Sequence, residues 1–117
     1  MKPSSAKAKG RKLQQFVRDQ LIERLELQSD DVKSTSMGAG GEDIQLSPFA
    51  RIRFPQSIEC KSRSKIAVYE WYAQAKANAG SHSPLVVIKQ DRSDPLVVLS
   101  LDDYLKLYER NLLDIQK

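Results

Sequence analysis

Two acidic residues and a lysine are spaced in a way that could hydrolyse phosphodiesters. Glu59 and Lys61 flank Cys60, and Asp43 lies sixteen residues upstream of Glu59. An acid on one strand, followed by acid-x-Lys on the next, can gather two carboxylates and an ammonium group around one divalent metal ion. A second acid-x-Lys triplet at 31–33 has no acid on a preceding strand, so its context favours a turn.

Strand geometry predicts how these side chains would meet. Alternate side chains of a strand share one face, so Glu59 and Lys61 should point one way while Cys60 points into the opposite, buried layer. If Asp43 lies on a neighbouring strand, about 5 Å away, two carboxylates come together. They would repel each other unless a cation bridged them, and hard oxygen ligands suit Mg²⁺ or Mn²⁺. Such an ion would polarise a phosphate and activate water, while Lys61 would stabilise the transition-state oxygens.

The hydrophobic pattern predicts the elements that must position this site. Helical spacing of apolar residues indicates a helix from about Lys9 to Leu27 and another over 66–79, which Gly80 would end. A last helix should run from 101 to about 113, with Ser100 as its cap. Strands are predicted at 32–36, 43–46, 56–61, 84–88 and 96–99, with a glycine-rich turn at 38–41 and a short helical link after Ser47-Pro48. The order αβββαββα predicts an α/β fold in which helices flank a mixed central sheet.

Size and charge narrow the class of protein. A chain of 117 residues with 40% apolar and 29% charged residues fits one globular domain. No apolar run approaches the roughly 18 residues that span a bilayer, and neither a signal-peptide core nor a disulfide pair is present, so we expect a cytoplasmic protein. Residues 1–12 hold five basic groups and no acid. We therefore expect a flexible basic arm at 1–8 and a single domain at 9–117. The arm either meets phosphates or is a disordered tail that aids solubility.

Several short segments occur in one order that resembles a known group of enzymes: Lys9-Gly10, Val32-Lys33-Ser34-Thr35-Ser36, a glycine-rich loop, Glu42-Asp43-Ile44 and Ile58-Glu59-Cys60-Lys61. This layout resembles the PD-(D/E)xK nuclease superfamily, and within it the archaeal-type Holliday junction resolvases and related small phage-encoded nucleases. The similarity covers roughly residues 9–90. It implies a restriction-endonuclease-like fold, Mg²⁺ or Mn²⁺ as cofactor, DNA as partner and a homodimer.

The resemblance also assigns expected roles to residues. Asp43 and Glu59 would be metal ligands and Lys61 the catalytic lysine. Ser34 or Ser36 would match a hydroxyl near the active-site loop. Gln74 would help to position water or phosphate; the alternative is an exposed helix amide without a role in the site. One departure stands out: such resolvases carry a glutamate on the first helix, four residues after the glycine, where this chain has Gln14. We expect Gln14 to take that place. The alternatives are that another helix acid (Asp19 or Glu23) substitutes, or that metal affinity is lower. Glu42 could exchange with Asp43 if the strand bulges locally, so it is a secondary candidate for the metal site.

Basic residues beside the expected cleft are candidates for contacts to DNA phosphates. Such contacts would orient a duplex without reading its sequence, as recognition of DNA shape or branching requires. The candidates are Lys9, Arg11, Lys12, Arg51, Arg53, Arg63 and Lys65. The single histidine, His82, has no partner ligand for zinc, and Trp71 is expected in the core or at a dimer contact.

The sequence therefore predicts a Mg²⁺-dependent endodeoxyribonuclease that acts on branched DNA in recombination, in the host cytoplasm if phage-encoded. Two alternatives remain open. One is another nuclease of the superfamily, of nicking, phage DNA-processing or homing type. The other is a catalytically inactive DNA-binding module of the same fold, suggested by Gln14 in place of an acid. Nucleotide-driven work and covalent hydrolysis are excluded, because the chain has no Walker loop, dinucleotide-binding glycine motif or Ser-His-Asp set.

Overall fold

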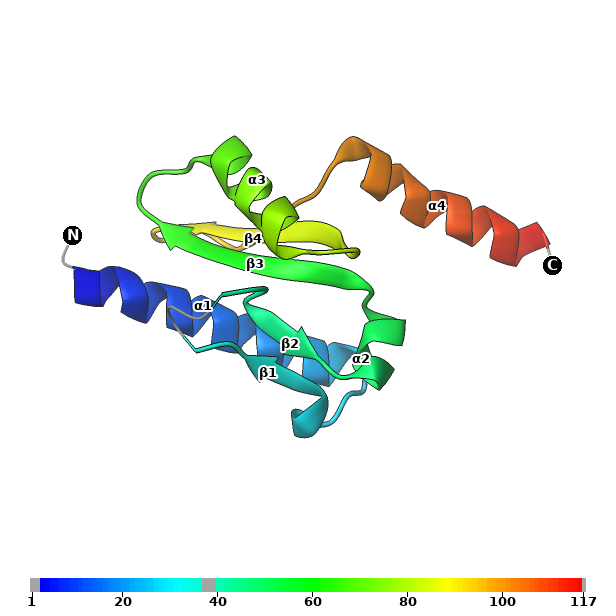
Figure 1. Cartoon of the computed structure of the whole chain (residues 1–117), viewed down its shortest axis with the longest axis horizontal. Coiled ribbons are helices and arrows are strands. Elements are labelled where there is room, and N and C mark those ends of the chain that lie inside the picture. The colour runs from blue at the N-terminus through cyan, green and yellow to red at the C-terminus, as the bar shows by residue number, and fades with distance from the viewer. Residues whose placement is uncertain (1–2, 37–39, 117) are drawn as a thin grey trace.

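The computed structural model describes residues 3–36 and 40–116, with side chains described from residue 5 to residue 112. The elements follow the predicted order (Figure 1). They are α1 (Pro3–Arg24), a 3-10 turn η1 (Ser29–Asp31), β1 (Val32–Ser34), β2 (Ile44–Leu46), α2 (Pro48–Arg53), β3 (Gln56–Arg63), α3 (Val68–Asn78), β4 (Ser83–Gln90), β5 (Leu96–Val98) and α4 (Leu101–Gln116). The prediction of an α/β fold with a short helical link before the third strand is confirmed. Among the described residues, no helix is both long and apolar enough to cross a membrane.

The strands form a mixed arrangement compatible with a restriction-endonuclease-like fold. β3 runs parallel to β4, with Glu59 opposite Val86, and β4 pairs antiparallel with β5. β1 and β2 form a separate antiparallel pair. That pair is tied to β3 just before β2 begins, where the Asp43 N–H donates to the Ile58 carbonyl at 3.0 Å. The two parts of the sheet therefore meet at Asp43.

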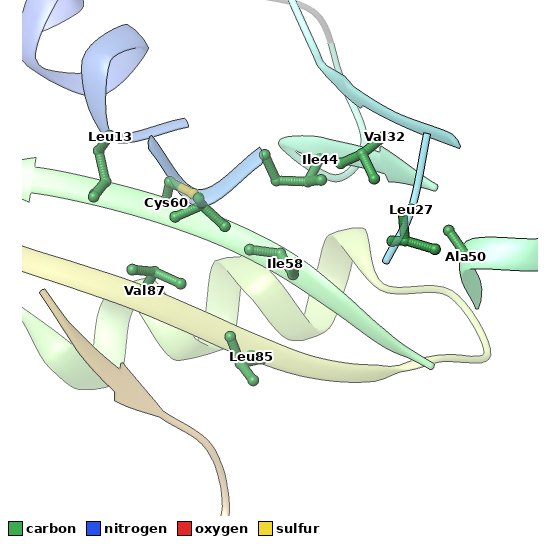
Figure 2. Close-up of a cluster of buried hydrophobic side chains, with 10 residues drawn as sticks. Leu13, Leu27, Val32, Ile44, Ala50, Ile58, Cys60, Leu85 and Val87 are labelled. Carbon is green, nitrogen blue, oxygen red and sulfur yellow. The ribbon is translucent and has the colours of Figure 1, made fainter. Parts of the chain in front are cut away.

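Side-chain alternation divides the molecule into two packed layers. On one face of β3 and β4, Ile58, Cys60, Leu85 and Val87 pack with Leu13 and other residues of α1, β1 and β2 (Figure 2). On the other face, Val86 and Ile88 pack against Trp71 and Ala75 of α3. Glu59 and Lys61 alternate with Ile58 and Cys60, so they lie on the α3 face. Cys60 lies in the buried layer on the opposite face, as predicted, and the face that carries Glu59 and Lys61 is also covered, by α3.

Local signals explain where several helices begin and end. The Ser47 hydroxyl accepts from the Ala50 N–H at 3.1 Å and so caps α2, whose first residue is Pro48. Ser100 accepts from the Asp103 N–H at 3.0 Å and caps α4 in the same way. After α3, Gly80 adopts a φ of 60°, a conformation that side chains disfavour. These three boundaries match the sequence signals.

The first helix differs from the prediction at both ends. α1 begins at Pro3 rather than near Lys9, and it ends at Arg24 rather than near Leu27. Gly10 is therefore inside the helix and does not open it. Residues 3–8 of the expected flexible arm are helical, which corrects that part of the prediction; the division into an arm and one domain stays a prediction. The glycine-rich turn expected at 38–41 lies partly outside the described residues.

Candidate active site

Asp43 is fixed by contacts to the residue that follows β1 and to β3. Its carbonyl accepts from the Thr35 N–H at 2.8 Å, and its own N–H donates to Ile58. The carboxylate Oδ2 accepts from the Cys60 N–H at 2.8 Å. This side chain therefore occupies a hydrogen-bonding position on β3 and is aimed at the acid-x-Lys triplet.

Glu59 and Lys61 complete the cluster on the same side of the sheet. Glu59 is only 4% exposed, and its Oε1 lies 3.7 Å from the Lys61 Nζ. Its Oε2 accepts a hydrogen bond from the Asn78 Nδ2 at 3.4 Å. Asp43 and Glu59 are close enough for a side-chain hydrogen bond between their carboxyl groups. The structure thus brings together the three residues that the sequence singled out.

Burial and mutual repulsion make the acidic pair costly to ionise. Burial raises the pKa of Asp43 above its ordinary value, although the Cys60 N–H and the Lys61 charge act in the opposite direction. Burial also raises the pKa of Glu59, and the neighbouring Asp43 charge raises it further against the effect of Lys61. Two carboxyl groups in this state favour a proton or a cation between them. Lys61 alone does not neutralise the pair.

Cys60 separates the two functional residues of the triplet but faces the other layer. The side chain is buried in the core beside α1. Burial raises the pKa of this thiol far above its usual range, and the negative charges of Asp43 and Glu59 add to the effect. Cys60 is therefore a packing residue and not a nucleophile.

Gln14 lies where α1 passes β1, and it is almost completely buried. Its side-chain oxygen accepts a hydrogen bond from the Ser34 hydroxyl at 2.6 Å. The structure thus links two residues of the predicted site, Gln14 and Ser34, to each other. Ser36 is exposed instead. The alternative helix acids, Asp19 and Glu23, are exposed, and Asp19 forms an ion pair with Arg18.

The short helix α2 uses its arginines within the fold. Arg51 forms an ion pair with Glu42 and donates to the Gln56 carbonyl at 2.9 Å. Arg53 donates to the Leu25 carbonyl, and its guanidinium lies 4.7 Å from the centre of the Phe49 ring. Glu42 therefore turns toward α2, and neither arginine is brought to the acidic pair.

On α3, the structure places an amide at the site that the sequence did not indicate. Asn78 contacts Glu59, whereas Gln74, the predicted glutamine, is exposed one turn earlier on the helix. Residues four apart share a helix face, so Gln74 lies on the Asn78 side of α3. This spacing was the available signal for Asn78, but only the packing of α3 on the sheet shows which amide reaches Glu59.

The remaining basic candidates lie around the fold. Lys9 forms an ion pair with Asp91 at 2.8 Å, and with Lys12 it lines a cavity between α1 and the turn after β4. Arg11 and Lys65 are exposed, and Arg63 is half-buried and donates to the Ser62 carbonyl at 3.0 Å. His82 is an exposed residue of the loop between α3 and β4.

The donor chemistry of the acidic pair fits a hard divalent cation. Asp43 and Glu59 offer carboxylate oxygens, the ligands that Mg²⁺ and Mn²⁺ prefer. A cation would offset the burial that raises the pKa of both carboxyl groups and the Asp43 charge that raises the pKa of Glu59 further. Across residues 3–36 and 40–116, no three His, Cys, Asp or Glu side chains gather into a larger ligand group. Any such cation would therefore be held by two acidic side chains, Asp43 and Glu59.

A mixed sheet carrying an aspartate beside Glu-Cys-Lys defines the class of PD-(D/E)xK nucleases. The chain matches the family described as "Phage putative PDDEXK endonuclease" over residues 5–116. This protein belongs to that phage endonuclease family, which confirms the resemblance found in the sequence. No significant match was found among curated proteins or among solved structures.

Proposed function

We propose that this protein is a divalent-metal-dependent DNA endonuclease that hydrolyses phosphodiester bonds in branched DNA. The contact between the Asp43 and Glu59 carboxyl groups, with the Lys61 ammonium 3.7 Å from Glu59, is the observation that carries the proposal. Membership of a phage endonuclease family supports the reaction class. The branched substrate rests on the resemblance to Holliday junction resolvases.

Each residue of the site has a proposed task. Asp43 and Glu59 would hold Mg²⁺ or Mn²⁺, which when bound supplies positive charge at the scissile phosphate. The Cys60 N–H and the Asn78 amide hold the two carboxylates in place, so the acidic pair is preorganised. Lys61 would stabilise the negative charge that develops on the phosphate oxygens as water adds and the phosphorus–oxygen bond breaks.

Symmetric cutting of a four-way junction needs two such sites. Because the described residues of one subunit bring together a single site of this kind, at Asp43 and Glu59, we expect a homodimer with the two sites related by a two-fold axis. Exposed basic residues such as Arg11, Lys12 and Lys65 remain candidates for phosphate contacts. Arg51 and Arg53 are weaker candidates, since both are engaged within the fold.

Cleavage of a substrate panel tests the proposal. Four-way junction, flap, single-stranded and linear duplex DNA would be incubated with Mg²⁺ or with EDTA, and wild type compared with Asp43→Asn. We expect Mg²⁺-dependent cleavage with a preference for the junction, lost in the variant. Cleavage in EDTA, or undiminished cleavage by the variant, would refute the chemistry, whereas preference for linear duplex would refute only the substrate.

A catalytically inactive DNA-binding module is the second candidate. It is favoured by the small ligand set, since two carboxylates meet and the residue in the place of the first-helix glutamate is a neutral amide engaged by Ser34. DNA binding without cleavage of any substrate in Mg²⁺ or Mn²⁺ would support this reading over the first.

A further inference from the structure

The last helix, α4, directs its mainly polar face toward the rest of its own subunit and leaves its apolar face exposed. Its polar residues Asp103, Lys106 and Arg110 lie with Leu107 along Pro55, Gln56 and Ser83 of the body. Its main apolar stripe points elsewhere and consists of Leu101, Tyr104, Leu105, Tyr108 and Leu112. In a helix that packs on its own core, the apolar face would be the covered one.

The stripe is continuous and highly exposed. Its members recur at helical spacing, so they lie on one side of α4. Their exposed fractions run from 44% for Tyr104 to 71% for Leu101. Figure 1 shows α4 leaving the sheet and extending away from it. An exposed apolar face of this kind marks an interaction site rather than ordinary surface.

The aromatic part of the stripe is already ordered. The Tyr104 and Tyr108 rings meet edge to face with their centroids 5.3 Å apart, and their hydroxyl oxygens are 3.1 Å apart. Because each ring restricts the other, less conformational entropy remains to be lost when a partner covers them.

The charges of α4 argue against nucleic acid or an anionic membrane as the partner. Residues 101–116 contain four acidic residues (Asp102, Asp103, Glu109, Asp114) and two basic residues (Lys106, Arg110). DNA would require a basic face, and helices that lie on membranes are rich in Lys and Arg on their polar side. The partner is therefore expected to be a protein surface.

The area of the stripe fits a second copy of the same chain. With about 150–250 Å² for a fully exposed large side chain, the exposed fractions of the five residues amount to roughly 500 Å². Homodimer interfaces are about 65% apolar and bury about 800 Å² on each partner, which corresponds to roughly 500 Å² of apolar surface. An apolar stripe is also complementary to itself, as a two-fold contact demands.

We infer that α4 is a dimerisation helix, whose outward stripe packs against the same stripe of a second copy of this chain. The contact would join two subunits through their C-terminal helices and leave the acidic pair of each subunit outside the interface. It specifies the surface for the homodimer proposed above, but the packing itself needs no metal and no catalysis.

Sedimentation equilibrium of the full chain, over a concentration series in the micromolar range, tests the inference. We expect wild type to sediment at twice 13.3 kDa. The double variant Leu105→Lys/Leu112→Lys should be a monomer, with a dissociation constant raised at least about 100-fold, because two ammonium groups would be placed in an apolar contact. Leu107→Lys is the matched control: the same substitution on the body-facing side of α4 should change the dissociation constant by less than about three-fold.

Native helix content by far-UV circular dichroism would accompany each measurement. If the double variant fails to fold, Tyr108→Ala removes part of the stripe without adding charge and should weaken the dimer at least about ten-fold. A monomeric wild type, a double variant that remains dimeric, or a Leu107→Lys monomer would each overturn the inference. Because sedimentation measures assembly alone, such a result would leave the nuclease proposal standing.

Discussion

Replacing Asp43 by asparagine should make the metal-free protein more stable even though it abolishes cleavage. In wild type the Asp43 and Glu59 carboxyl groups are in contact, and burial together with the neighbouring charge raises the pKa of Glu59. Two unit charges about 4 Å apart repel by about 4 kcal/mol at an effective dielectric constant of 20. Lys61 and partial proton uptake offset part of this repulsion. We therefore expect the free energy of unfolding of Asp43→Asn to exceed that of wild type by about 1–2 kcal/mol at pH 7.5 in EDTA. The asparagine oxygen can still accept from the Cys60 N–H.

The pH dependence of this gain has a defined sign. A carboxyl group whose pKa is raised in the folded state stabilises the fold below its unfolded pKa, and this contribution is lost as pH rises through the folded value. The pKa values of Asp43 and Glu59 are both raised, from ordinary values of 3.8 and 4.5 respectively. The stability of wild type should therefore approach that of Asp43→Asn as pH falls through the raised pKa values. The difference between their free energies of unfolding should then shrink toward zero.

Thermal unfolding in EDTA and in Mg²⁺ measures both effects. A gain of about 1 kcal/mol corresponds to roughly 3–6 °C for a domain of this size. Saturating Mg²⁺ should reverse the order, because wild type gains about 2.7 kcal/mol at one hundred times the dissociation constant and the variant binds the ion weakly. Glu42→Gln is the control: it removes an acid that pairs with Arg51, so it should not stabilise the protein. An Asp43→Asn variant less stable than wild type in EDTA at pH 7.5 would refute the reasoning.

Three further substitutions probe single contacts. Lys61→Met should lower the cleavage rate at least about 100-fold while leaving Mn²⁺ binding intact, and an equal loss of both would contradict the proposed role of Lys61 in stabilising transition-state charge. Asn78→Ala should weaken metal binding or cleavage about 10–100-fold, because the Asn78 amide donates a hydrogen bond to Glu59. Gln74→Ala on the same helix should have a smaller effect. Metal titration and single-turnover kinetics would compare the two variants. Ser47→Ala should reduce the free energy of unfolding, measured by urea denaturation, by about 1 kcal/mol. The reason is that Ser47 caps α2 and also donates to Asp31 at 2.7 Å. An effect no larger than that of Ser81→Ala, at an exposed serine, would contradict this.

The sequence was sufficient to predict the strand that carries Glu59 and Lys61, because alternation along β3 is a local property. It also predicted that Asp43 would meet Glu59, since the apolar residues Ile44 and Ile58 fix the burial of the two strands. Helix caps at Ser47 and Ser100 could be predicted for the same reason, as each depends on a few neighbouring residues.

Other features depend on contacts between distant segments. Positive charge at Arg51 and Arg53 suggested phosphate binding, but the partners Glu42 and Leu25 lie elsewhere in the chain. The contact of Asn78 with Glu59 depends on how α3 crosses the sheet. Likewise, the pattern of α4 shows that the helix is amphipathic, but only the fold shows that its polar side faces the body.

Stoichiometry of Mn²⁺ binding, followed by electron paramagnetic resonance of the free ion, tests most directly whether the acidic pair is a metal site. Wild type should bind one Mn²⁺ per chain, and Asp43→Asn and Glu59→Gln should each lose that site. Glu42→Gln should retain it, because Glu42 is paired with Arg51. Equal binding by all four proteins, or no binding by wild type, would contradict the account.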